Sequence, residues 1–146
     1  MISLLSIHPR KVSRDVTPED YPYLQKIRKE WQELCFQPIG RVRSALAIAH
    51  VQIEANDPIR AFMRVDGTLF INPKIVDVED PTTHLEGCMT WPYRDFKKVK
   101  RYGRVFVEGI RLSQKGKAVG FMEWFDGKEA FIFQHEIGHF NLNTLY

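Results

Sequence analysis

The chain has 146 residues, enough for one domain with a real core and too few for two, so we expect a single domain over residues 1–146. Hydrophobic residues at 44% and charged residues at 27% suit a soluble globular protein, and no apolar stretch is long enough to span a membrane. The net charge of +3 does not indicate DNA binding, and we expect a monomer. Two cysteines in unrelated contexts and the absence of a signal-peptide pattern predict a reducing, cytoplasmic location.

The first third of the chain predicts an extended arm followed by an amphipathic helix. The arm covers residues 1–19, and apolar residues then recur with helical spacing between residues 20 and 35. Asp20 is placed to cap this helix. Residues 45–53 contain several small side chains and end near the amide of Gln52, a composition that fits a short helix or a closely packed strand.

The middle of the chain reads as strands joined by tight turns. Residues 59–65, 69–78 and 99–107 have strand composition, and Asp-Gly at 66–67 is a favourable hairpin turn. A further strand at residues 119–125 precedes the last helix, for which Asp126-Gly127 is the predicted start signal. These elements predict an α+β fold, in which a mixed or antiparallel sheet surrounds the C-terminal helix and the N-terminal helix packs outside.

A basic cluster overlaps the strand predicted at residues 99–107. Its members are Arg94, Lys97, Lys98, Lys100, Arg101 and Arg104. A solvated strand face is the simpler interpretation, and a surface that contacts phosphate groups is the alternative.

The most informative stretch is residues 134–139, which read Gln-His-Glu-Ile-Gly-His. Two histidines four positions apart lie on one face of a helix, so His135 and His139 can bind one metal ion. Glu136 beside the first histidine can then hold and deprotonate a water molecule. The core-facing stripe of this helix consists of Phe133, Ile137 and Phe140. An amphipathic helix with two solvated histidines is the alternative interpretation.

A metal site of this kind needs a third protein ligand, and the residues after His139 offer no carboxylate, imidazole or thiol. Cys88 is the best upstream candidate, because the sequence Glu-Gly-Cys-Met-Thr-Trp-Pro belongs to a loop or a strand edge from which a thiolate can point outward. Cys35 lies on an apolar helix face, where we expect a buried core residue. The remaining candidates, His8, His50 and His84, are isolated in the sequence. A lone structural cysteine at position 88 is the alternative.

Three stretches taken together resemble the peptide deformylase family. That family has a Gly-rich segment ending in Gln, then Glu-Gly-Cys-Leu-Ser, then Gln-His-Glu-x-Asp-His, in this order. The counterparts are residues 45–52, 86–90 and 134–139, with weaker matches at 71–75 and 99–107. The resemblance covers most of the chain from about residue 20 to 142.

The resemblance implies a metal-dependent hydrolase that removes the formyl group from N-formylmethionyl nascent peptides in a bacterium or an infected bacterial host. Cys88, His135 and His139 would bind one divalent ion, Fe²⁺ before Zn²⁺, Ni²⁺ or Co²⁺, and Glu136 would be the general acid/base. A transient contact with the ribosome is left open. The short segment after His139 resembles the compact members that some phages carry.

The same resemblance implies further site residues. The Gln52 amide and the backbone N–H of Met89 would stabilise the oxyanion that forms on the formyl carbonyl. Residues implied to contact the peptide or its methionine side chain are Leu46, Ala47, Glu86, Gly87 and Phe131. Gln134, together with Glu86, would support the metal ligands.

Four positions depart from the family pattern. Ala45 and Ala47 replace glycines, His50 replaces a small residue, and Gly138 replaces an Asp that in relatives can pair with the strand arginine, here Arg101. These departures leave alternatives open. One is a weak or inactive relative that binds N-terminal peptides, the second is another metal hydrolase with this helix motif, and the third is a ribosome-binding structural protein.

Overall fold

The computed structural model describes residues 2–5, 10–37, 45–88 and 95–142. Over these residues, five strands form one antiparallel sheet in the order β1-β2-β3-β4-β5. The helices are α1 (Tyr21–Leu34) and α2 (Gly127–Phe140), with 3₁₀ turns at Pro18–Asp20 and His50–Gln52. The strands are β1 (Ala47–Ala49), β2 (Ala61–Arg64), β3 (Leu69–Glu86), β4 (Lys97–Leu112) and β5 (Ala118–Asp126).

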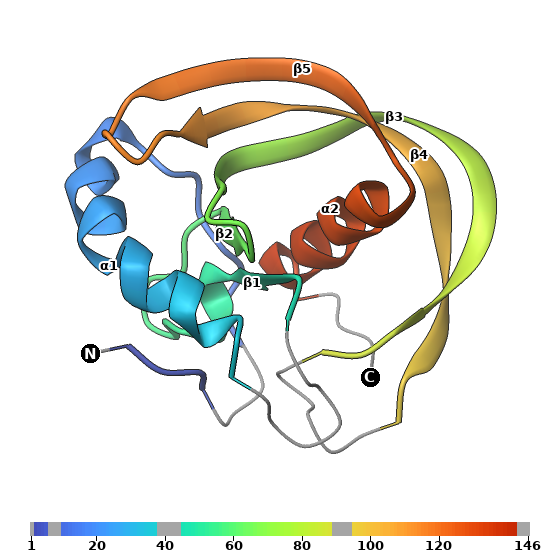
Figure 1. Cartoon of the computed structure of the whole chain (residues 1–146), viewed down its shortest axis with the longest axis horizontal. Helices are drawn as coiled ribbons and strands as arrows, with labels where there is room; N and C mark the ends of the chain where they lie inside the picture. The colour runs from blue at the N-terminus through green and yellow to red at the C-terminus, as the bar shows by residue number, and fades with distance from the viewer. Residues whose placement is uncertain (1, 6–9, 38–44, 89–94, 143–146) are drawn as a thin grey trace.

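The long strands β3, β4 and β5 arch over α2, whereas α1 lies on the outside of the molecule (Figure 1). The predicted α+β class, with an antiparallel sheet around the C-terminal helix and the N-terminal helix outside, is therefore confirmed. Neither α-helix in the described part of the chain combines the length and apolar character required to cross a membrane.

The beginning of the sheet is packed between the two helices, because its side chains alternate between two hydrophobic clusters. One cluster, on the α1 side, contains Leu24, Trp31, Ile48, Ala61, Met63, Leu69 and Ile71. The other, on the α2 side, contains Ala47, Ala49, Phe62, Phe70, Phe133 and Phe140. Residues 45–53, for which a helix and a strand were both considered, form β1 and the following 3₁₀ turn. The small residues of β1 thus face the metal-motif helix.

The strands β3 and β4 extend well beyond their predicted limits of 69–78 and 99–107. In its second half β3 is mostly exposed and contains Pro81, so no alternation of buried side chains marks it as a strand. Its backbone nevertheless pairs with β4 as far as Glu86, opposite Lys97. The pairing register between β3 and β4 shifts after Ile71 and again after Ile75. Asn72, in the first of these irregularities, adopts a φ of +49°.

The two helix starts differ in how well they were predicted. Asp20 precedes α1 but does not cap it through its side chain, so that prediction is wrong. Its carboxylate instead accepts the Thr17 N–H at 2.9 Å and pairs with Arg14 at 2.9 Å, which stabilises the 3₁₀ turn. The predicted start of α2 is confirmed, because Asp126 is extended and Gly127 takes a φ of +58° that favours glycine.

Some residues of the basic cluster are exposed to solvent, and others form ion pairs. Lys98 and Lys100 are exposed on β4, whereas Arg101 and Arg104 bind carboxylates. Arg94 lies outside the described residues. A role in phosphate binding stays an untested alternative.

His50 is part of a buried polar network beneath α1. Its side chain is only 1% exposed, its Nδ1 accepts the Ile59 N–H at 3.1 Å, and its Nε2 lies 2.7 Å from the Tyr23 hydroxyl. Because Nδ1 accepts, Nε2 carries the proton of a neutral ring. Burial lowers the pKa of His50 to about 4, although Glu54 and Asp57 oppose this effect.

We expect His50 to make the protein less stable in acid. An unfolded imidazole takes up a proton near pH 6.5, whereas the folded one does so only near pH 4. The unfolded state therefore binds more protons in this window, and the unfolding free energy falls as pH falls, by up to about 3 kcal/mol. Urea unfolding of wild type and His50→Gln at several pH values measures this, and equal pH dependence in both proteins would contradict it.

Candidate metal centre

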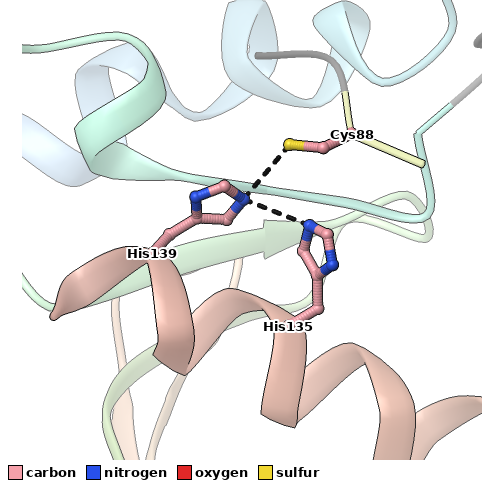
Figure 2. A group of neighbouring side chains, drawn as sticks. All are labelled: Cys88, His135 and His139. Atoms are coloured by element: carbon pink, nitrogen blue, oxygen red, sulfur yellow. Dashed lines mark hydrogen bonds between the residues drawn. The ribbon is translucent and has the colours of Figure 1, made fainter. Parts of the chain in front are cut away.

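The side chains of Cys88, His135 and His139 converge on one point (Figure 2). Cys88 follows β3, while His135 and His139 rise from the same face of α2. The Cys88 Sγ lies 3.2 Å from His139 Nε2, which in turn lies 3.1 Å from His135 Nε2. The three ligand atoms all fall within 4.8 Å of one another. The predicted ligands are therefore brought together.

The chemistry of this group fits a bound cation. A thiolate and two imidazoles form a common donor set for zinc and similar ions, with one position left open. Burial alone would raise the pKa of Cys88, but the facing imidazoles of His139 and His135 outweigh it and hold that pKa well below its usual value. The thiolate, which binds metals, is thus the favoured form. We conclude that these three residues can hold a metal ion.

Glu86 orients His135 through a hydrogen bond to the ring nitrogen that does not face the other two candidate ligands. Its carboxylate is 6% exposed and accepts His135 Nδ1–H at 2.8 Å. Arg101 donates two hydrogen bonds at 2.8 and 2.9 Å, and His84 Nδ1 lies 3.0 Å away. Burial would raise the pKa of Glu86, but His135 and Arg101 outweigh burial and lower it to about 2. The bond to Nδ1 turns Nε2 of His135 toward the other ligands.

The same contacts alter the titration of His135. Burial disfavours the charged ring, but the Cys88 sulfur and the Glu86 carboxylate raise the pKa of His135 to about 10. The proton on this ring compensates the thiolate and the carboxylate. A metal cation at the three ligand atoms would supply the same compensation.

Gln134 fixes α2 to the neighbouring strand. Its Oε1 accepts the Tyr102 N–H at 2.8 Å, and its Nε2 donates to the Tyr102 carbonyl at 2.7 Å. The pairing of β5 with β4 ends at Arg104, so the Gln134 amide continues the ladder where β5 has left it. Gln134 therefore supports His135 and His139 indirectly, because it fixes the helix α2 that carries them to the backbone of β4.

Two predicted catalytic groups face the ligands. Glu136 is 3% exposed, and its Oε2 has no hydrogen-bond partner among the described residues. Burial raises the pKa of Glu136, which makes it a better proton acceptor. Gln52 accepts the Ala49 N–H at 2.8 Å through Oε1 and directs Nε2 to the Cys88 sulfur at 3.6 Å. Met89 lies outside the described residues.

A cavity of about 180 Å³ opens beside the ligands. All five residues that the resemblance implied for peptide contact line it, namely Leu46, Ala47, Glu86, Gly87 and Phe131. At Gly87 the Phe96 ring comes so close that an added Cβ would lie 2.4 Å from it. Any larger residue at this position would therefore force the exposed Phe96 ring to move.

The sequence interpretation missed four residues of this cavity, His84, Leu85, Phe96 and Ile132. His84 was taken as isolated, yet it lines the cavity and contacts Glu86. The available signal was its position two residues before Glu86, because such residues share one face of a strand. Arg101, considered as a partner for position 138, is instead engaged by Glu86.

The fold and the site together define an α+β protein with a largely buried Cys-His-His group that can hold a metal ion, beside a small cavity. The sequence model of the polypeptide deformylase family matches residues 10–146. The chain belongs to this family, and the resemblance found in its sequence is confirmed.

Individual relatives agree with this assignment. A peptide deformylase of Neisseria meningitidis serogroup C is 40% identical over 76 residues, which are 52% of this chain and 42% of that protein. The match thus spans less than half the length of that relative. The Thermotoga maritima peptide deformylase structure has a TM-score of 0.78 at 24% identity and covers 99% of this chain and 95% of that chain. A probable peptide deformylase of synechococcus phage S-SSM7 has a TM-score of 0.75 at 20% identity, covering 99% and 97%. Both structures share the fold.

The two cysteines permit a controlled test of the metal centre. Wild type titrated with Co²⁺ without oxygen should develop a sulfur-to-cobalt absorption band, which Cys88→Ser should lose. Its Co²⁺ affinity should fall by more than the roughly 10- to 100-fold that loss of a supporting hydrogen bond costs. Cys35→Ala is the matched control, because Cys35 is buried in the α1-side cluster. A band that persists in Cys88→Ser would exclude Cys88 as a ligand.

Proposed function

We propose that this chain hydrolyses the formyl amide of N-formylmethionyl peptides and releases formate. The observation that carries the proposal is the buried Glu136 carboxylate beside the Cys88, His135 and His139 cluster, at the wall of a small cavity. Membership of the polypeptide deformylase family supports it. Residues 1–146 would act as one catalytic unit.

Cys88, His135 and His139 would hold one divalent ion, with Fe²⁺ as the proposed native metal and Zn²⁺, Ni²⁺ or Co²⁺ as substitutes. Such an ion supplies Lewis acidity, which activates water near neutral pH. Glu86 would keep His135 oriented for this task through its 2.8 Å bond to Nδ1.

Glu136 would move the proton during the reaction. Its Oε2, which has no hydrogen-bond partner among the described residues, would accept the proton that the attacking water loses. The same carboxylate would return this proton to the amine nitrogen as the C–N bond breaks. Negative charge develops on the formyl oxygen in between. The Nε2–H of Gln52 and the backbone N–H of Met89 would stabilise that charge.

The cavity would receive the first side chain of the peptide. Its apolar walls include Leu46, Phe131 and Ile132, which suit the thioether chain of methionine. In the described sheet β1 pairs only with β2, so its other edge is open to the peptide backbone near Ala47.

The partners and location follow from this activity. We propose that the substrates are nascent chains in the cytoplasm, that any ribosome contact is transient, and that the protein works as a monomer. A weak or inactive relative that only binds N-terminal peptides is the alternative, and formate release from a formyl-Met-Ala-Ser peptide distinguishes the two.

Glu136→Gln should separate metal binding from chemistry. Glutamine is nearly isosteric, so His135 and His139 should keep their positions and the metal should be retained. Turnover should fall by about 100- to 10,000-fold, at the higher end because one group transfers the proton in both directions. Formate release and metal content are measured under anaerobic conditions. A metal-loaded variant with more than about a tenth of wild-type turnover would show that Glu136 is not the base.

Gln52→Leu should remove one oxyanion donor. Loss of such a donor lowers turnover by roughly 100- to 1000-fold, with a smaller effect on KM. Gln52→Glu is the matched variant, because it keeps an acceptor for the Ala49 N–H and lacks the Nε2–H donor. Both variants should be slow, and normal kcat in either would contradict the proposed role.

A further inference from the structure

His50 is a buried histidine that the proposed reaction does not use, and it begins the 3₁₀ turn that ends at Gln52. Both nitrogens of its ring are engaged. The Ile59 N–H donates to Nδ1 at 3.1 Å, and Nε2–H donates to the Tyr23 hydroxyl at 2.7 Å. Tyr23 belongs to α1 and Ile59 leads into β2, so the ring ties the turn to two other parts of the fold.

The Gln52 side chain takes its direction from the same turn. Its Oε1 accepts the N–H of Ala49, the residue directly before His50, at 2.8 Å. The turn is closed by the Ile53 N–H, which donates to the His50 carbonyl at 2.9 Å. Because Oε1 is held by the backbone at the start of the turn, the direction of the Nε2–H group depends on how the turn is oriented.

Helix α1 also holds the strand that leads into this turn. Trp31 Nε1 donates to the Ile48 carbonyl of β1 at 3.0 Å, and the Trp31 ring lies edge-on to His50 with 5.7 Å between centroids. Tyr23 and Trp31 are about two helical turns apart, so both reach the sheet from one side of α1. Because Trp31 and His50 are both almost fully buried, water cannot readily replace a bond lost from this network.

We propose that His50 is a positioning residue for the oxyanion donor: its ring fixes the 3₁₀ turn to α1 and to the start of β2, so that the Nε2–H of Gln52 keeps its direction toward the formyl oxygen. The inference rests on the proposed function, since it names the residue that orients the proposed donor. His50 acts only through Gln52 and does not touch the substrate. A small residue is usual here in the family pattern, so this anchor is a feature of this chain.

A competing explanation is that His50 only stabilises the fold. In that case its loss would lower the melting temperature and the amount of folded protein, but the enzyme that remains folded and metal-loaded would keep its kcat. Positioning predicts instead that kcat falls in the folded enzyme, and that this fall requires the Gln52 amide.

Three variants remove the anchor in steps. His50→Ala removes both hydrogen bonds of the ring. His50→Asn keeps an acceptor for the Ile59 N–H, because its Oδ1 takes the place of Nδ1, and loses the bond to Tyr23. Tyr23→Phe removes only the hydroxyl. Leu112→Ala is the matched control for lost stability, because Leu112 is an equally buried member of the same α1-side cluster at the end of β4.

Formate release from formyl-Met-Ala-Ser, measured per bound metal ion, gives kcat and KM for each variant. In His50→Ala, kcat should fall roughly 10- to 100-fold, since a misplacement of about 1 Å can cost about 100-fold in rate. In His50→Asn and Tyr23→Phe, which each lose one hydrogen bond, it should fall about 3- to 10-fold. KM should change little, because the donor acts on the transition state. Leu112→Ala should melt earlier and keep its kcat. A kcat in His50→Ala equal to that of wild type would overturn the proposal.

A double-mutant cycle tests whether His50 acts through Gln52. When His50→Ala is added to Gln52→Leu, kcat should stay within about 2-fold of the value for Gln52→Leu alone, because the donor that His50 positions is already absent. If the two losses of kcat multiply, His50 acts by another route and the proposal is wrong.

Amide hydrogen exchange of the zinc-loaded protein tests the positioning without turnover. The Ala49 N–H, which bonds to Gln52 Oε1, should exchange about 10-fold or more faster in His50→Ala than in wild type, measured relative to the amides of β3 and β4. Leu112→Ala should not change this ratio. If wild type releases no formate, the proposed function fails, yet the Ala49 exchange still tests whether His50 fixes the Gln52 side chain. If wild type is active and the exchange ratio is unchanged in His50→Ala, the inference alone fails.

Discussion

The buried Glu86 carboxylate is the constraint on which the site depends. An unpaired charge in this position would be costly, and three side chains from β3, β4 and α2 compensate it. Arg101 can reach Glu86 only because β3 and β4 pair along their full length. The second half of β3 is exposed and shows no alternation of buried side chains, but its pairing with β4 positions the site. It places Arg101 and Glu86 next to His135, and it places Cys88 two residues after Glu86.

The scaffold beneath the site is rigid for a different reason. The strands β1, β2 and the start of β3 are packed on both faces. On the face toward α2, the packed side chains form a close aromatic cluster. Phe133 contacts Phe62, Phe70 and Phe125 with ring centroids 4.5–5.4 Å apart. These contacts lock the rotation of α2 about its axis. The next residues along that helix are Gln134, His135 and Glu136, so their directions are set by the core.

Sequence reasoning succeeded where the signal was local and chemical. The spacing of His135 and His139 and the loop context of Cys88 identified the three residues that the structure brings together, although the Cys88 side chain is buried and does not point outward as expected. It failed where the outcome depends on distant partners. The continuation of β3 past residue 78 rests on backbone pairing with β4, Asp20 is drawn away from its helix by Arg14, and His84 gains its role from Phe131 and Glu86. Apart from the two-residue spacing of His84 and Glu86, none of these contacts follows a periodicity that a single sequence can display.

The departures from the family pattern each have a local explanation in the structure. His50 packs beneath α1 with Tyr23 and Trp31, on the side of the sheet away from the cavity. Ala45 and Ala47 line the cavity, and both are buried, Ala45 in the α1-side cluster and Ala47 in the α2-side cluster. Arg101, which the sequence resemblance suggested as the partner of an Asp at position 138, binds Glu86 through Nε and Nη2.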